Sequence, residues 1–176
     1  NLTMMTDLYQ LTMMSGYVRH GMQDSRACFD LFYRRQGETT AYTLAAGLEQ
    51  AIDYIKNLHF DEEDIRYLGS LGCFDEEFLR YLRTLHFTGD IWAMPEGSVV
   101  FPNEPILRVT APIIEAQLVE TALLNIIGHQ TLIATKAARV VHAAGNGSVL
   151  EFGLRRAQGP DAGIYGARAA MIGGCR

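Results

Sequence analysis

The chain has 176 residues, of which 48% are hydrophobic, so it is long enough to bury a core and to form one or two domains. Its formal net charge of −5 argues against a nucleic-acid-binding surface and against a polybasic segment that binds membranes. No window approaches the roughly 20 apolar residues of a membrane span. The first residues do not form a signal peptide, and Cys28, Cys73 and Cys175 lack CxxC spacing, so we expect a cytoplasmic protein.

The first part of the chain predicts helices mixed with short strands. Leu8, Leu11, Met14 and Val18 follow helical spacing after a capping pair, Asp7 and Gln10, and this helix should end near residue 21. Further along we expect strands at 27–35 and 41–45, a helix at 48–58, helices capped by Asp61 and Asp75, and three short strands within 91–110.

Beyond Pro112 the sequence predicts a different series of elements. Two buried helices at 113–127 and 130–144 are expected to break at Gly128, and a buried strand at 148–152 should lead into a loop at 153–159. A last helix should begin at Asp161, and its small residues favour close packing on a sheet. These residues are Ala162, Gly166 and Ala170.

The predicted fold class is therefore α/β in two parts. An α+β domain over residues 1–111 precedes the start of an α/β barrel over residues 112–176. A closed barrel needs about eight strands, so we expect the barrel to be incomplete here and the chain to be a piece of a longer polypeptide.

The most informative local feature is the run EFGLRR at 151–156. It places an aromatic ring, Phe152, and two guanidinium groups, Arg155 and Arg156, where a strand is expected to give way to a loop. In parallel α/β folds ligands bind at that edge, and such groups suit an anionic aromatic ligand. The spacing is equally compatible with a core phenylalanine and two solvated arginines, and that simpler interpretation is the more frequent one.

Two other places carry candidate binding residues. Asp7 and Tyr9 stand at the head of the first helix, although a capping aspartate and a core-edge tyrosine would explain them. Arg34 ends an apolar strand and could bind phosphate, yet charged strand ends are common. The five histidines lack metal-ligand spacing, and no P-loop or nucleophile elbow is present. The histidines are His20, His59, His86, His129 and His142.

Five segments, in order along the chain, resemble bacterial nicotinate phosphoribosyltransferases, and the match runs from Thr6 to Gly174. The segments are TDLYQLTM from Thr6, PEG from Pro95 through FPNEP from Phe101, ETALLN from Glu120, HQT from His129 through TKAAR from Thr135, and EFGLRRAQGPDA from Glu151. Several independent segments make this more specific than any single motif.

The resemblance implies a type II phosphoribosyltransferase. Such an enzyme has an N-terminal α/β domain, an irregular α/β barrel, and active sites shared across a head-to-tail homodimer. Its substrates would be nicotinate and phosphoribosyl pyrophosphate, with Mg²⁺ and ATP as cofactors.

The resemblance also implies roles for individual residues. Phe152 matches the residue that stacks on the pyridine ring, Arg155 the arginine beside the ring and the ribose phosphate, and Arg156 is a weaker candidate for phosphate binding.

A second group of residues would come from the neighbouring subunit. Tyr9 would close the other face of the ring, with Asp7 beside it, and Arg34 would bind phosphate. The loop at 36–40 is shorter than the family pattern.

The family couples ATP hydrolysis through a phosphorylated histidine in the second half of the barrel, and none of the five histidines matches it. The catalytic residues therefore stay unassigned, and we expect the chain alone to be inactive and to aggregate. The alternatives are a relative that acts on nicotinamide or quinolinate, and a non-catalytic fragment or partner-binding domain. The motifs GLRR and TDLYQ favour a nicotinate-specific enzyme over a relative that acts on nicotinamide or quinolinate.

Overall fold

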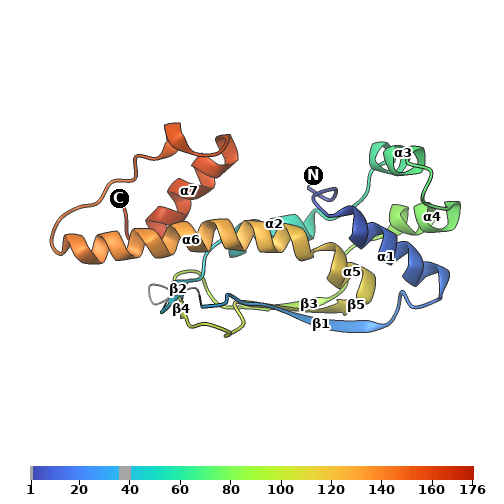
Figure 1. The fold of residues 1–176 in the computed structure, drawn as a ribbon, viewed down its shortest axis with the longest axis horizontal. Coiled ribbons are helices and arrows are strands. Elements are labelled where there is room, and N and C mark those ends of the chain that lie inside the picture. Colours follow the sequence, from blue (N-terminus) through green and yellow to red (C-terminus); the bar gives the residue numbers. More distant parts are fainter. Residues whose placement is uncertain (1, 36–40) are drawn as a thin grey trace. The chain divides into compact units, whose positions relative to one another are not determined.

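The structure, a computed structural model, describes residues 2–35 and 41–176 as a mixed α/β fold (Figure 1). One sheet has the strand order β1-β5-β3, and a second pairs β2 with β4 in antiparallel register, Thr43 opposite Val100. The elements in chain order are α1 (Leu8–Arg19), β1 (Arg26–Leu31), β2 (Thr43–Leu44), α2 (Leu48–Lys56), α3 (Glu62–Ser70), α4 (Glu76–Thr84), β3 (Asp90–Ala93), β4 (Val99–Val100), β5 (Leu107–Pro112), α5 (Ile113–Leu118), α6 (Glu120–Ala144), the 3₁₀ turn η1 (Leu154–Arg156) and α7 (Pro160–Ile172).

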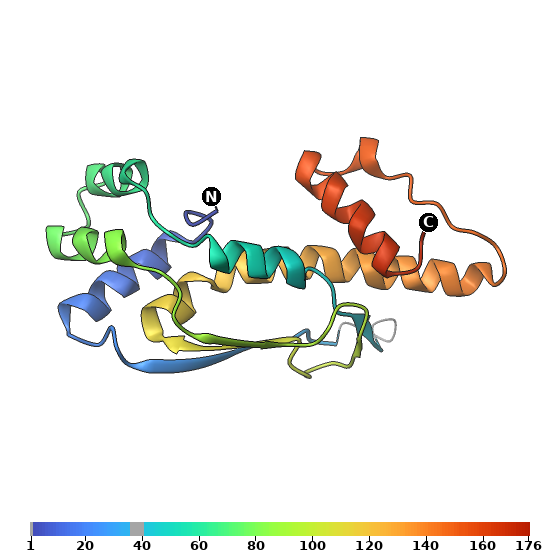
Figure 2. The ribbon, with the colours of Figure 1, turned by 180° about the vertical axis from the view of Figure 1, so that it is seen from behind.

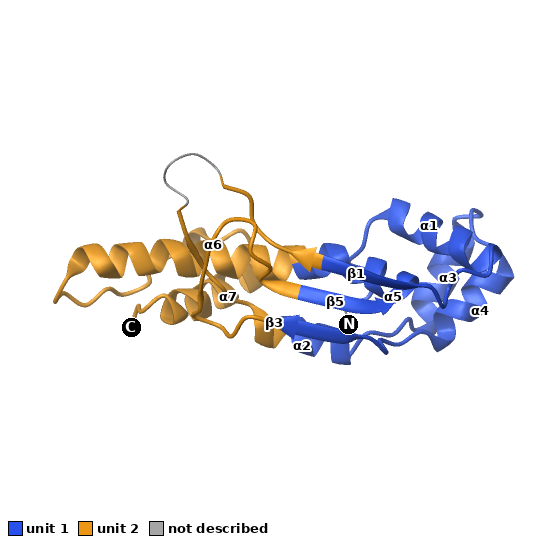
Figure 3. Cartoon of the chain, turned by 90° about the horizontal axis from the view of Figure 1, so that it is seen from below, with its two compact units in different colours: residues 1–29, 51–92, 108–123 blue, residues 30–50, 93–107, 124–176 orange. Residues whose placement is uncertain are grey.

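The chain divides into two compact units that interleave in sequence (Figure 3). Unit 1 comprises residues 1–29, 51–92 and 108–123, and unit 2 comprises residues 30–50, 93–107 and 124–176. The predicted domain boundary near residue 111 and the barrel stay predictions.

Unit 1 is built from short helices whose ends the sequence encodes. Asp61 caps α3 by accepting hydrogen bonds from the backbone N–H groups of Glu63 and Asp64, and Asp75 caps α4 by accepting one from Phe78. Both predicted caps are confirmed. Helix α1 packs against α4 and α5, and α3 against α4. The apolar faces of these helices supply large buried side chains, Met14, Leu68, Phe78, Leu82, Ile114 and Leu118.

Unit 2 is organised around the long helix α6. Thr131 and Thr135 are buried on it and bond to the β2 segment, where Thr135 Oγ1 accepts from Leu44 N at 2.9 Å and Thr131 Oγ1 accepts from Ala46 N at 3.2 Å. Helix α7 lies alongside α6 (Figure 2), and Ala134 and Ala169 meet there with Ala46 in a small buried cluster. Small side chains therefore set the spacing between these helices.

The predicted buried strand at 148–152 is wrong. These residues form no regular structure, Leu150 is 67% exposed and Phe152 is 74% exposed. A buried strand needs backbone partners on its flanks, and among the described residues the segment's backbone bond is the one from Arg176 N to Val149 O, 2.9 Å. An apolar run alone does not provide those partners.

Two helix predictions also need correction. The break expected at Gly128 lies instead at Val119, between α5 and α6, and Gly128 sits inside α6. One glycine costs a helix only about 1 kcal/mol, which packing easily offsets. The small face of α7 packs on a helix: a Cβ at Gly166 would lie 3.2 Å from Ile133 Cδ1 of α6.

Several strands are shorter than predicted. The strand expected at 27–35 ends at Leu31, and the one expected at 41–45 is reduced to Thr43–Leu44. The loop at 36–40 lies outside the described residues. Within the part of the chain that the structure describes, no helix combines the length and the apolar character required to cross a membrane.

Candidate functional site

Phe152 and Arg155 come together on the loop before α7. The Arg155 guanidinium carbon lies 5.4 Å from the centroid of the Phe152 ring, within the range of a cation–π contact. Arg155 belongs to η1, a single turn in which Arg156 N donates to Gly153 O at 2.8 Å. Both side chains are exposed, so together they present a flat ring and a guanidinium to a ligand.

The helix that follows holds this turn in place. Helix α7 begins at Pro160 and approaches η1 closely, because a Cβ at Gly163 would lie 2.5 Å from Leu154 Cδ1. His129 of α6 contacts the same end of α7, with Nε2 3.3 Å from Ala162 O. Arg156 is exposed as well.

Arg34 lies beyond the end of β1 and is exposed. Its guanidinium carbon stacks 5.4 Å from the centroid of the Phe32 ring, so a local contact orients it. The phosphate-binding role expected of Arg34 stays a prediction.

In unit 1, Asp7 and Tyr9 lie at the start of α1. Asp7 is the N-cap residue in extended backbone, as the sequence predicts, and Gln10 Oε1 accepts a hydrogen bond from Asp7 N at 3.1 Å. Tyr9 is 53% exposed. Partial burial and the neighbouring carboxylates of Glu120 and Asp7 raise the pKa of Tyr9 above its ordinary value, so its hydroxyl keeps its proton and can donate.

The structure thus gathers the predicted residues into two groups. Phe152, Arg155, Arg156 and Arg34 belong to unit 2, and Phe152 and Arg155 touch. Asp7 and Tyr9 belong to unit 1.

Gln10 is fully buried beneath Asp7 and Tyr9, and the sequence indicated only its capping role. Its Nε2 donates to Gln117 O at 3.0 Å and to Glu120 Oε2 at 2.9 Å, across the junction of α5 and α6. Helix α1 is therefore bonded, not merely packed, against that junction.

The other side of the Gln10 amide is occupied as well. Its Oε1 accepts from Thr6 Oγ1 at 2.5 Å and from Thr121 Oγ1 at 2.9 Å, in addition to Asp7 N. Thr121 Oγ1 also lies 2.9 Å from Asp7 Oδ2, so its proton is shared between Gln10 and Asp7.

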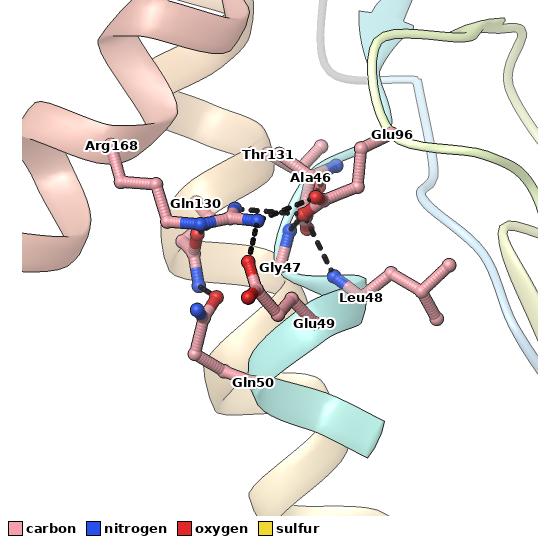
Figure 4. Close-up of polar contacts among 9 residues, drawn as sticks. All are labelled: Ala46, Gly47, Leu48, Glu49, Gln50, Glu96, Gln130, Thr131 and Arg168. Carbon is pink, nitrogen blue, oxygen red and sulfur yellow. Dashed lines mark hydrogen bonds and ion pairs between the residues drawn. The ribbon is translucent and has the colours of Figure 1, made fainter. Parts of the chain in front are cut away.

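An ion-pair network centred on Arg168 was not predicted from the sequence (Figure 4). Arg168, on α7, pairs with both carboxylate oxygens of Glu96, at 2.9 and 2.6 Å, and with Glu49 Oε2 at 2.6 Å. Its Nη1 also donates to Gln130 Oε1 of α6 at 3.1 Å. Hydrogen bonding from Arg168 is the main cause that lowers the pKa of Glu96 below its ordinary value.

Glu96 also accepts hydrogen bonds from the backbone at the start of α2. Its Oε1 accepts from Gly47 N at 2.6 Å and from Leu48 N at 3.0 Å, so it caps the N-terminus of α2 from a distant turn. Glu96 joins the Pro95–Gly97 turn to α2 and α7. Gln130 connects α6 to the same network. This network connects distant elements within unit 2.

No group of three or more His, Cys, Asp or Glu side chains among the described residues could hold a metal ion. The residues at hand offer ring stacking, guanidinium groups and a tyrosine hydroxyl. They suit the binding and orientation of an anionic aromatic molecule.

The family model that matches is the nicotinate phosphoribosyltransferase (NAPRTase) N-terminal domain, over residues 4–128. The nicotinate phosphoribosyltransferase of Bacillus subtilis is 52% identical over 174 residues, 99% of this chain and 36% of the relative. That of Mycobacterium tuberculosis is 48% identical over 96% of this chain and 36% of the relative. The chain thus spans about a third of the length of these curated relatives.

Solved structures of related proteins are also similar to this chain. Human nicotinic acid phosphoribosyltransferase superposes with a TM-score of 0.88 at 40% identity, covering 97% of this chain and 35% of the human one. The nicotinate-nucleotide pyrophosphorylase of Pyrococcus furiosus has a TM-score of 0.75 at 24% identity, covering 97% of this chain and 36% of that one, and shares the fold.

Proposed function

The chain belongs to the nicotinate phosphoribosyltransferase N-terminal domain family, and we propose that a protein of its relatives' length containing this chain, below called the full-length protein, joins nicotinate to phosphoribosyl pyrophosphate. The observation that carries the proposal is the contact between Phe152 and Arg155, because a ring face beside a guanidinium suits a pyridine carboxylate. The similarity to relatives with that printed activity supports it.

In the proposed reaction the pyridine nitrogen forms a bond to ribose C1 while the bond from C1 to the pyrophosphate oxygen breaks. Positive charge develops at C1 and then resides on the pyridinium ring of nicotinate mononucleotide. Phe152 would hold the ring flat and Arg155 would hold its carboxylate, so the nitrogen is aimed at C1. Orientation of this kind accounts for a large share of the rate of such a displacement.

Each active site would be shared by two subunits of a homodimer. Tyr9 and Asp7 of one subunit would close the site that contains Phe152 of its partner, and Arg34 would bind a phosphate group there. Exposure of Tyr9 and Arg34 supports this arrangement, since both can meet a second copy of the chain.

Mg²⁺ and ATP enter the proposal from the family resemblance. Among the described residues no three His, Cys, Asp or Glu side chains come together to hold a metal ion, so no step is assigned to a metal held by them. Mg²⁺ would accompany the pyrophosphate of the substrate. A cytoplasmic enzyme without nucleic-acid or membrane partners fits the net charge of −5.

The proposal is tested by incubating the full-length protein with phosphoribosyl pyrophosphate, Mg²⁺, ATP and labelled nicotinate, nicotinamide or quinolinate in separate reactions. Nicotinate mononucleotide should form with a kcat/KM that exceeds those for the other two substrates by about a hundredfold or more, because nicotinamide gives the Arg155 guanidinium no anionic partner and quinolinate adds a second carboxylate beside the attacking ring nitrogen. Preference for nicotinamide or quinolinate would contradict the proposal.

The shared site is tested by mixing subunits. Tyr9→Ala and Phe152→Ala proteins should each be impaired, but a mixed dimer contains one site with both wild-type residues, so activity should return when the two are refolded together. Absence of rescue, with mixed dimers detected by native mass spectrometry, would place Tyr9 in the site of its own subunit.

A further inference from the structure

The start of α1 is fixed by one buried amide. Gln10 is 0% exposed, and its amide bonds to five groups from three stretches of chain. A buried amide that lost these partners would carry a large desolvation penalty, so the bonded arrangement is held firmly. The Gln10 amide makes more hydrogen bonds than a helix cap requires, since the capping bond uses only Asp7 N.

The anchoring of Gln10 controls where Tyr9 points. Successive residues of a helix are rotated by about 100° around its axis, so a Gln10 side chain fixed inward turns Tyr9 to the exposed side of α1. Tyr9 is 53% exposed, whereas Gln10 is 0% exposed. The side of α1 from which the Tyr9 side chain leaves the helix therefore depends on bonds made by its buried neighbour.

Thr121 extends this control to Asp7. Its hydroxyl lies between Gln10 Oε1 and Asp7 Oδ2, 2.9 Å from each, and so ties the exposed carboxylate to the buried amide. Because Thr121 lies on α6 and Asp7 precedes α1, this bond also joins the two elements.

We propose that Gln10 and Thr121 are positioning residues: they hold Asp7 and Tyr9 in the geometry in which these two residues complete the active site of the neighbouring subunit. This inference rests on the proposed function. Gln10 and Thr121 act through Asp7 and Tyr9 and do not touch the substrate.

Two variants of the full-length protein test the inference. Thr121→Val keeps the shape of the side chain and removes only the bridging hydroxyl, so kcat/KM for nicotinate should fall about fivefold. Gln10→Leu removes the whole network, and the fall should be about a hundredfold. Thr84→Val is the matched control, because within the described part of the chain Thr84 Oγ1 donates to Tyr81 O of its own helix. It should keep wild-type kinetics.

Subunit mixing separates positioning from a general loss of structure. If Gln10 and Thr121 serve the half of the site that is lent to the partner, mixing either variant with Phe152→Ala should restore activity, since one site of each mixed dimer is then intact. Mixing with Tyr9→Ala should restore nothing, because both variants damage the same half-site. If Gln10→Leu does not fold, Thr121→Val decides the matter.

Each outcome is decisive. Wild-type kinetics in both folded variants, or a loss that Phe152→Ala and Tyr9→Ala rescue equally, would overturn the positioning role while leaving the proposed function intact. A full-length wild-type protein that makes no nicotinate mononucleotide would instead overturn the proposed function.

Discussion

Among single residues, Phe152 and Arg155 form the contact on which the proposed nicotinate binding rests. In a cation–π contact the guanidinium lies over the ring, and its N–H donors stay available to a ligand. A carboxylate held by two of those donors would bring an attached aromatic ring close to Phe152. The geometry of η1 fixes this pairing, since Arg155 and Phe152 are only three residues apart.

Arg155→Lys in the full-length protein should lower kcat/KM for nicotinate by about tenfold or more, because an ammonium group cannot reproduce the bidentate contact or the planar stacking. Steady-state kinetics at saturating phosphoribosyl pyrophosphate measure the effect. Arg66→Lys, at an exposed residue of α3, is the control and should behave as wild type. Equal kinetics in both variants would remove Arg155 from the site.

The sequence predicted local features of the residues well and distant contacts poorly. Asp7, Asp61 and Asp75 are recognisable because a cap and its helix lie within four residues of each other. Arg168 and Glu96 are 72 residues apart, and no local pattern marks either as one half of an ion pair. The candidate site was identified from its motif, whereas the residues that support it became visible only in the fold.

At the scale of elements, the Arg168 network determines how α7 and the loop before it are held. The side chains of Arg168 and Glu96 are 26% and 21% exposed, whereas those of the Arg19–Asp75 pair in unit 1 are 63% and 42% exposed. Solvent screens the second pair far more than the first. The two pairs therefore form a matched comparison.

Arg168→Met should lower the free energy of unfolding by about 2 kcal/mol, since it leaves the Glu96 carboxylate without its main partner. Arg19→Met should cost less than about 1 kcal/mol. Denaturant titrations of the full-length variants followed by circular dichroism compare the two. A larger loss in Arg19→Met would show that the network around α7 is not the stronger one.

The lowered pKa of Glu96 gives this contribution a pH dependence. A carboxylate whose pKa is lower in the folded than in the unfolded state stabilises the protein above its ordinary pKa, about 4.3, and that stability is lost as the pH falls through the folded value. The difference in unfolding free energy between wild type and Glu96→Gln should therefore be largest at neutral pH and shrink below about pH 4. Glu77→Gln, at an exposed residue of α4, is the matched control. A difference that grows on acidification would contradict the assignment.

The element that the sequence predicted least well is the segment at 148–152. Its apolar residues indicate burial, but burial of a strand depends on what pairs with its backbone, and that information lies elsewhere in a sequence. Helices were predicted more accurately because their hydrogen bonds are internal. Even there, the junction between α5 and α6 was misplaced, since Gly128 is a weaker break than it appeared to be.

At the scale of the whole molecule, unit 2 leaves several large apolar side chains uncovered. Exposed apolar surface promotes association. The side chains concerned are Leu132 at 73% exposure, Leu150 at 67%, Met171 at 65% and Ile164 at 62%.

Residues 1–176 expressed alone should therefore aggregate, and they should show no phosphoribosyl transfer. Light scattering during size-exclusion chromatography, together with an assay for nicotinate mononucleotide, tests both expectations. A Leu132→Lys and Ile164→Lys double variant should aggregate less, since charge interrupts the exposed apolar surface. A monodisperse wild-type fragment with turnover would show that these residues suffice for catalysis.

We propose that nicotinate is held by Phe152 and Arg155 and covered by Tyr9 of a second subunit. A crystal structure of the full-length protein with bound nicotinate mononucleotide would show this arrangement. We expect the pyridine ring to stack within about 4 Å of the Phe152 ring, with its carboxylate on Arg155 and Tyr9 of the neighbouring subunit on the opposite face. A pyridine ring bound elsewhere, or a Tyr9 that reaches the ring from the same subunit, would rule this arrangement out.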